Sequence, residues 1–191
     1  FLAFCFEWTG FMKEGFGYMS SLPVSLDGSN NGLQHFSAML RDPVGSKATN
    51  LSCEDVPQDI YQEVADVTKT LVSQSDELMA KQWLESGLIN RKLCKRPVMV
   101  VPYGGGLFSC KKYIEERLRE AFMEGHPNPW RGMDLYIPAQ WMSKHVWEAI
   151  SQVVVAAREA MDWIRDVVGR VSKEGYPMIW TSPSGFIVFQ Q

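Results

Sequence analysis

Apolar residues recur every three or four positions over much of the chain, and this period predicts helices rather than strands. The clearest stripe follows Ser52 and Asp55, a pair that resembles a capping box at the start of a helix. The stripe predicts a helix that extends to about residue 79. Its apolar residues are Val56, Ile60, Val64, Val67 and Leu71.

Further helices are predicted on both sides of this stripe. The first of them ends at Asp42 and Pro43, and the last begins at Pro138, because proline suits the first turn of a helix and disrupts later turns. The predicted ranges are 33–41, 80–86, 90–104, 111–123 and 138–171.

Only a few segments favour strands. Residues 21–26 alternate like a short strand and lead into a turn composition at 27–32. Residues 178–180 and 186–189 flank a Ser-Pro-Ser-Gly turn, which is typical of a hairpin. Residues 125–138 are rich in proline and glycine and favour a loop. The fold class that we expect is therefore α+β and mostly helical.

Composition permits a hydrophobic core and narrows the function only slightly. The 191 residues are 46% hydrophobic, enough for one or two domains, and the net charge of −3 gives no general attraction to nucleic acid. The four cysteines have no paired spacing, which favours a reduced, intracellular protein. No apolar run is long enough to span a membrane. The first residue, Phe1, and an apolar pattern up to Gln191 favour an internal fragment of a longer protein.

Residues 90–104 are the first candidate for chemistry. If the segment is helical, four of its side chains share one side, which would be roughly 18 Å long. This is about the length of an extended nucleoside triphosphate, with cations at one end for phosphates and an aromatic ring at the other for a base or sugar. The segment therefore suggests a nucleotide-binding helix. The i, i+4 neighbours on this side are Arg91, Lys95, Met99 and Tyr103.

The same pattern also fits a buried helix with a solvated basic end, and residue types alone do not separate the two interpretations. Pro97 and Pro102 complicate a straight helix, because each lacks an N–H and crowds the carbonyl four residues earlier. They could kink the helix or end it before Tyr103. We place the candidate nucleotide-binding helix at about residues 88–103.

Asp27 is the second candidate. A carboxylate followed by glycine can hold a divalent cation, with the Gly28 carbonyl as a further ligand. An ordinary Asx turn would have the same residues. A calcium loop fails, because its twelfth position is Ala38 rather than the required glutamate. A phosphate loop at the later glycine run fails too, because Cys110 precedes the lysine where glycine is required.

Taken together, these segments resemble a known family. Residues 27–42, DGSNNGLQHFSAMLRD, are similar to the first catalytic motif of single-subunit DNA-directed RNA polymerases of the T-odd bacteriophage type. Residues 91–104, with the pattern RxxxKRxxMxxxYG, resemble the second motif of these polymerases, which is carried on the fingers helix. Residues 1–7 and 180–186 also resemble flanking phage sequence, in the same order.

The resemblance implies a role for each matched residue. Asp27 would be one of two carboxylates that hold a pair of Mg²⁺ ions, with the Gly28 carbonyl as an added ligand. Lys95 and Tyr103 would complete the catalytic set, with Tyr103 beside the sugar and the template base. The residues that would contact the nucleotide are Arg91, Lys95, Arg96, Tyr103 and Gly104.

The resemblance also implies a partial right-hand polymerase fold. Residues 1–43 would be the first part of the palm, with the first catalytic motif, and residues 44–191 would be most of the fingers. The family's third motif, which carries the second metal-binding aspartate, is not in this chain. The fragment alone is therefore predicted to be inactive, although the intact parent would catalyse template-dependent ribonucleotidyl transfer.

Partners and location follow from the same resemblance. The parent would act as a monomer on a DNA template and promoter, use ribonucleoside triphosphates and extend a nascent RNA. It would work in the cytoplasm of an infected bacterium, and a mitochondrial relative is less favoured. A related DNA-directed DNA polymerase and a non-catalytic nucleotide-binding module are the alternatives. Ribo- versus deoxynucleotide use would separate the polymerases, and a second catalytic aspartate downstream would exclude the module.

Overall fold

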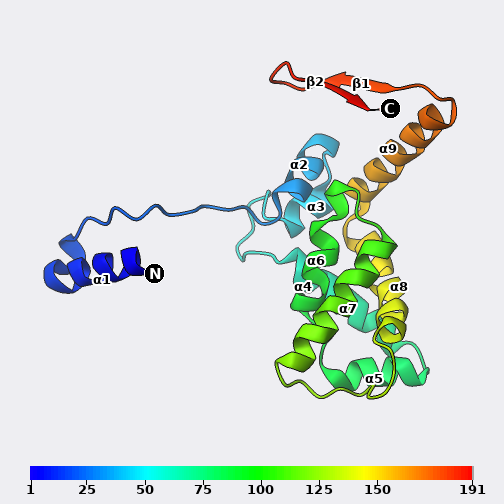
Figure 1. Ribbon diagram of the computed structural model, residues 1–191, viewed down its shortest axis with the longest axis horizontal. Coiled ribbons are helices and arrows are strands. Elements are labelled where there is room, and N and C mark those ends of the chain that lie inside the picture. The colour runs from blue at the N-terminus through cyan, green and yellow to red at the C-terminus, as the bar shows by residue number, and fades with distance from the viewer. Residues whose placement is uncertain (191) are drawn as a thin grey trace.

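The computed structural model describes residues 1–190, and helices dominate it (Figure 1). The expected α+β, mostly helical fold is confirmed. Within these residues no helix combines the length and the apolar character needed to cross a membrane. The elements are the helices α1 (Leu2–Glu14), α2 (Asn31–Leu40), α3 (Pro43–Ala48), α4 (Ile60–Ser73), α5 (Leu78–Ser86), α6 (Arg91–Met99), α7 (Leu107–Met123), α8 (Tyr136–Val153) and α9 (Val155–Lys173), the 3₁₀ turns η1 (Gly15–Gly17) and η2 (Val101–Tyr103), and the strands β1 (Met178–Thr181) and β2 (Ile187–Gln190).

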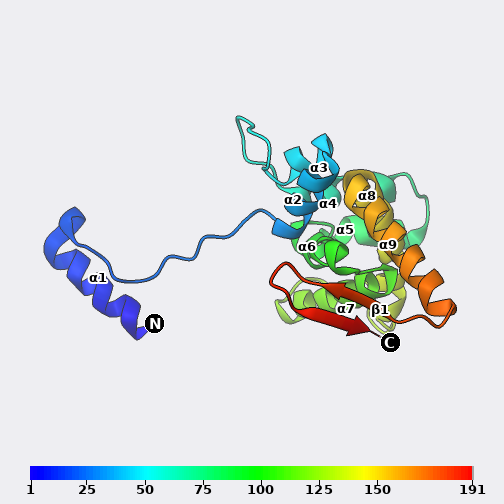
Figure 2. The ribbon, with the colours of Figure 1, turned by 90° about the horizontal axis from the view of Figure 1, so that it is seen from above.

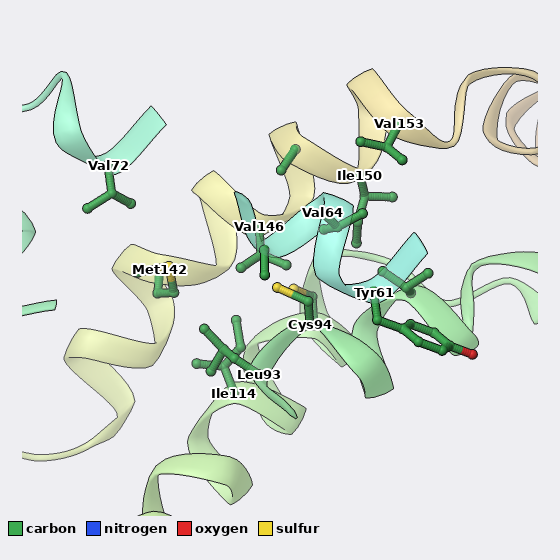
Figure 3. Close-up of a cluster of buried hydrophobic side chains, with 14 of the residues drawn as sticks. Tyr61, Val64, Val72, Leu93, Cys94, Ile114, Met142, Val146, Ile150 and Val153 are labelled. Atoms are coloured by element: carbon green, nitrogen blue, oxygen red, sulfur yellow. The ribbon is translucent and has the colours of Figure 1, made fainter. Parts of the chain in front are cut away.

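The core lies between α4, α6, α7 and α8, which pack against one another. Apolar residues at helical spacing place one side of each helix in this core, where full burial of a large side chain contributes about 1.5–3 kcal/mol. Figure 3 shows side chains of these helices meeting there. Examples are Val64 of α4, Leu93 of α6, Ile114 of α7 and Met142 and Val146 of α8, each at most 1% exposed.

Helix α4 begins later than its apolar stripe predicts. The Asp59 carboxylate caps it by accepting two backbone hydrogen bonds, one of them from the Tyr61 N–H at 3.0 Å. The predicted capping box at Ser52 is therefore wrong, and Val56 is exposed. Pro57 explains the late start, because the residue before a proline is disfavoured in the helical conformation.

The predicted single helix from Pro138 to about residue 171 is interrupted at Val154. The backbone there (φ −111°, ψ 62°) leaves the helical region, so α8 ends at Val153 and α9 begins at Val155. Consecutive valines favour the break, because β-branched side chains are poorer helix formers. The break also lets two adjacent side chains be buried at 3% exposure, those of Val153 and Val154. Helix α9 then lies against α2, α3 and η2.

Residues 21–26, predicted as a short strand, form no strand. They run as a largely exposed segment between η1 and α2. A strand needs a neighbour to satisfy its backbone hydrogen bonds, and this segment has none among residues 1–190. Figure 2 shows α1 at the far end of this segment, apart from the other helices, and no residue of α1 is buried.

The predicted hairpin is confirmed. Strands β1 and β2 pair antiparallel, from Met178 opposite Gln190 to Thr181 opposite Ile187. The connecting turn places Gly185 at a φ of 84°, a left-handed conformation that glycine adopts without steric strain.

All four cysteines are free thiols, and two of them lie in the core. Cys94 of α6 and Cys110 of α7 are both 0% exposed. Burial disfavours the charged thiolate, so it raises the pKa of Cys94 to about 12 and raises the pKa of Cys110 as well. These two thiols stay protonated in the folded chain at neutral and moderately alkaline pH.

We predict that the two buried thiols make the folded chain less stable at high pH. Above about pH 9 the unfolded chain loses thiol protons that the folded chain keeps, so the free energy of unfolding falls as pH rises. The limit is about 1.4 kcal/mol per pH unit for each thiol. Urea unfolding between neutral pH and roughly pH 10.5 should show a shallower decline in the double variant Cys94→Ala, Cys110→Ala.

The control is Cys53→Ala, because it also removes a thiol, but from an exposed position rather than from the core. This variant should lose stability with pH as steeply as the unsubstituted chain does. An equally steep decline in the double variant would refute the contribution of the buried thiols.

Candidate nucleotide-binding site

A cavity of about 360 Å³ lies where four segments of the chain meet. These segments are the turn before α2, the start of α4, one side of α6 and the end of η2. Both candidate segments from the sequence therefore line one cavity. The lining residues are Asp27, Gly28, Ser29, Asn30, Asn31, Gln58, Asp59, Ile60, Tyr61, Arg91, Lys95, Met99 and Tyr103.

Helix α6 has two unlike sides. Leu93 and Val98 are buried in the core. Arg91, Lys95 and Met99, at i, i+4 spacing, line the cavity on the other side. These three side chains therefore share one side of α6, as the sequence predicted, and that side faces the cavity.

The helix is shorter than the predicted range of about 88–103. Pro97 is buried within it and does not end it. Pro102 has no N–H to donate to the carbonyl of Val98, so the α-helix stops before this proline. The chain continues as η2, and Tyr103 reaches the cavity from this 3₁₀ turn rather than from an α-helix.

Arg91 is held in place by residues of α4. Its Nε lies 2.5 Å from Oδ2 of Asp59, and its guanidinium carbon lies 5.1 Å from the centre of the Tyr61 ring. The other Asp59 oxygen caps α4, so this carboxylate contacts both helices. Burial raises the pKa of Tyr61, whose hydroxyl points away from the core cluster in Figure 3. Arg91 is thus positioned at the cavity wall and paired with the Asp59 carboxylate.

Lys95 and Arg96 are neighbours in sequence but differ in their surroundings. Lys95 lines the cavity and forms no ion pair with any residue in the range 1–190. Arg96 pairs with Glu116 and Glu120 of α7, at 3.2 and 3.0 Å. The structure therefore does not bring Arg96 into the cavity with Arg91, Lys95 and Tyr103, and its two carboxylate partners lie on α7.

Tyr103 lies at the cavity edge against the first turn of α2. The residue is 74% exposed. A Cβ on Gly32 would lie 3.3 Å from the Tyr103 hydroxyl and 2.7 Å from Pro102, so the two segments approach this closely because residue 32 is glycine. Gly104 follows at a φ of 85° and does not line the cavity itself.

Asp27 and Gly28 form an exposed acidic edge of the cavity. The Asp27 carboxylate accepts a hydrogen bond from the Gly28 N–H at 2.8 Å, and the Gly28 carbonyl accepts one from the Asn30 N–H at 3.0 Å. Both groups keep oxygen lone pairs for a metal, and hard oxygen donors suit Mg²⁺. No cluster of three or more His, Cys, Asp or Glu side chains suited to a metal occurs within residues 1–190. Asp27 and Gly28 thus fit part of a Mg²⁺ site.

Asp59 and Tyr61, the two residues that contact Arg91, were not predicted from the sequence. Asp59 is an ordinary helix-cap residue, and Tyr61 lies beside an ordinary apolar stripe. They contact Arg91 because α4 packs on α6, and this tertiary contact cannot be predicted from the sequence around either residue. The one available signal was Pro57, which places the start of α4 close to Asp59.

Comparison with known proteins identifies the family of this chain. The family model described as DNA-dependent RNA polymerase matches residues 1–191. The chain belongs to this polymerase family.

Relatives of this polymerase chain include phage and mitochondrial proteins. It is 34% identical to the T7 RNA polymerase of Escherichia phage T7 and 35% identical to the DNA-directed RNA polymerase of Enterobacteria phage K11, and all of the chain is covered. It is 34% identical to the mitochondrial DNA-directed RNA polymerase of Mus musculus over 91% of the chain. The chain spans 26%, 25% and 14% of the length of these three relatives.

Proposed function

We propose that this polymerase-family chain forms the nucleotide-binding part of an enzyme that copies DNA into RNA by Mg²⁺-dependent ribonucleotidyl transfer. The observation that best supports the proposal is the cavity, where the turn before α2 brings the Asp27 carboxylate, α6 brings two cations and η2 brings the Tyr103 ring. The relatives are RNA polymerases, which favours ribonucleotides over the DNA-polymerase alternative.

A ribonucleoside triphosphate has the chemistry that this cavity would recognise. The planar fork of Arg91 can bind two phosphate oxygens, and Lys95 supplies a point charge one turn away. Tyr103 offers an exposed ring for stacking and a hydroxyl for the ribose 2′-hydroxyl, the group that distinguishes RNA from DNA.

Asp27 and the Gly28 carbonyl would hold Mg²⁺ together with a second carboxylate from outside this chain. The bound metal would lower the pKa of an attacking 3′-hydroxyl and neutralise the leaving pyrophosphate. The contribution of this chain is to place one carboxylate in the same cavity as the phosphate-binding cations. We therefore propose that the chain alone binds a nucleotide without polymerising it.

We also propose the wider setting of this chain. Residues 1–43 would belong to the palm and residues 44–191 to the fingers of a polymerase that acts as a monomer. Its partners would be a DNA template and promoter and the nascent RNA. The phage relatives support a location in the cytoplasm of an infected bacterium, and the mitochondrial relatives support the alternative, a mitochondrial polymerase.

Removing either cavity cation should weaken triphosphate binding to the chain. Arg91→Gln and Lys95→Gln should each raise the Kd for ATP roughly tenfold, because each removes a charge-assisted hydrogen bond. Isothermal titration calorimetry at low salt would measure the change. Arg96→Gln is the matched control, since it removes the same charge from α6 but leaves the cavity unchanged. An equal loss in all three variants would show non-specific attraction.

Asp59→Asn should strengthen triphosphate binding. Asparagine caps a helix as well as aspartate does, so α4 should stay intact, whereas Arg91 loses its competing carboxylate. Partly exposed ion pairs contribute about 0.2–1 kcal/mol, so the Kd for ATP should fall by up to about fivefold. Calorimetric titration would measure the Kd, and thermal unfolding would show whether α4 keeps its stability. Weaker binding by a variant of normal stability would mean that Asp59 orients Arg91 for the ligand.

In the complete polymerase, Asp27→Asn should abolish RNA extension, because a neutral amide is a poor substitute for a charged metal ligand. Promoter binding, measured by a gel-shift assay, should stay near normal. Extension at the unsubstituted rate would refute the metal role of Asp27. RNA product formed by the purified chain alone would refute the need for a second carboxylate.

A further inference from the structure

Helix α9 contacts the segment that follows Tyr103. Nη2 of Arg165 donates hydrogen bonds to the Gly104 carbonyl at 2.6 Å and to the Gly105 carbonyl at 2.9 Å. We call this contact the Arg165 clasp. It joins residues 60 and 61 positions apart, so it depends on the tertiary packing of α9 and not on local sequence.

The segment held by the clasp is a tight turn of glycines. Residues 104–106 are all glycine, the residue that loses most backbone entropy when it is ordered. The turn is also tight, because a Cβ on Gly105 would overlap Val100. Its carbonyls follow the end of η2, where no further helical N–H is available to them. A guanidinium group suits this position in hydrogen bonding.

Arg165 is itself held in position. Asp162, three residues earlier on α9, pairs with its Nη1 at 3.2 Å. Met161, one turn earlier, has its Cε 3.9 Å from the position of a Cβ on Gly104, so one side of α9 makes both contacts. Ala157, a further turn back, is only 3% exposed, which anchors the start of α9.

Helix α9 also packs against α2, the helix that begins just after Asp27 and Gly28. The same helix thus contacts the turn that carries Tyr103 and the element that follows the carboxylate turn. Any shift of the glycine turn on α9 would move Tyr103 relative to the rest of the cavity.

We propose that Arg165 is a positioning residue that sets the pose of Tyr103, and with it the selectivity for ribose, by holding the glycine turn on α9. This inference rests on the proposed function of the cavity as a ribonucleotide site. Arg165 does not line the cavity, and it acts through the carbonyls of Gly104 and Gly105. Without the clasp the Tyr103 side chain would be less fixed in position. Recognition of the sugar would therefore weaken more than the rate of the chemical step would fall.

Hydrogen exchange in the chain without nucleotide tests the clasp itself. The amides of Tyr103, Gly104 and Gly105 bond to carbonyls of η2 and the residue before it. In Arg165→Met these amides should exchange roughly threefold to tenfold faster, and Arg165→Lys should be intermediate because it keeps the charge but loses the fork. Arg170→Met is the matched control: Arg170 pairs with Asp166 on the same helix, so exchange in the turn should not change.

Steady-state incorporation by the complete polymerase tests the consequence. The ratio of kcat/KM for a ribonucleotide to that for its deoxy analogue should fall roughly threefold to tenfold in Arg165→Met. The loss should come mainly from a higher KM for the ribonucleotide. Tyr103→Phe provides the reference for a lost hydroxyl, and Arg170→Met should keep the original ratio.

The two measurements separate the clasp from the proposed function. Unchanged exchange in Arg165→Met would overturn the clasp, and faster exchange with unchanged selectivity would overturn the positioning role. If Arg165→Met does not fold, Asp162→Asn, which loosens Arg165 but leaves it present, must show the same changes to a smaller degree. Absence of template-dependent incorporation by the unsubstituted polymerase would count against the proposed function and against ribose selection by the clasp.

Discussion

Burial of one side of α6 is the interaction on which the rest of the structure depends. Leu93 and Val98 enter the core, and each side chain of this size contributes about 1.5–3 kcal/mol when fully buried. With that side buried, Arg91 and Lys95 lie on the side that faces the cavity. The same packing brings the start of α4, with its capping aspartate, next to Arg91. Formation of the core therefore also forms the cationic wall of the site.

The sequence predicted the sides of helices better than their ends. Period alone shows which side of α6 is apolar, because residues three or four apart share a side on any helix. Helix ends depend on single residues and on packing. Pro57 and Asp59 set the start of α4, and Pro102 ends α6. The long predicted helix breaks where Val153 and Val154 are both buried in the core, and the local sequence does not show that both will be buried.

Part of the candidate site was also predictable. Residue type and spacing made Asp27, Arg91, Lys95 and Tyr103 candidates, the resemblance to polymerase motifs implied their roles, and all four line one cavity. Arg96 belongs to the same motif but pairs with glutamates of α7, because a motif records spacing and not the neighbours that packing supplies. The capping aspartate of α4 reaches the site, and the arginine of α9 reaches the glycine turn beside it, through tertiary contacts that their ordinary local sequence does not indicate.

The exposed segment before α2 gives the two ends of the cavity different stiffness. The cations stand on a helix anchored in the core, whereas Asp27 ends a run of extended, largely exposed residues. Fixing the backbone of one such residue costs about 1–2 kcal/mol of conformational entropy. Under the proposed function, a triphosphate would meet a helix that is already ordered, whereas a metal ion held by Asp27 would have to order the exposed segment that leads to it. Metal affinity, more than nucleotide affinity, would then depend on whatever else in the polymerase restrains this segment.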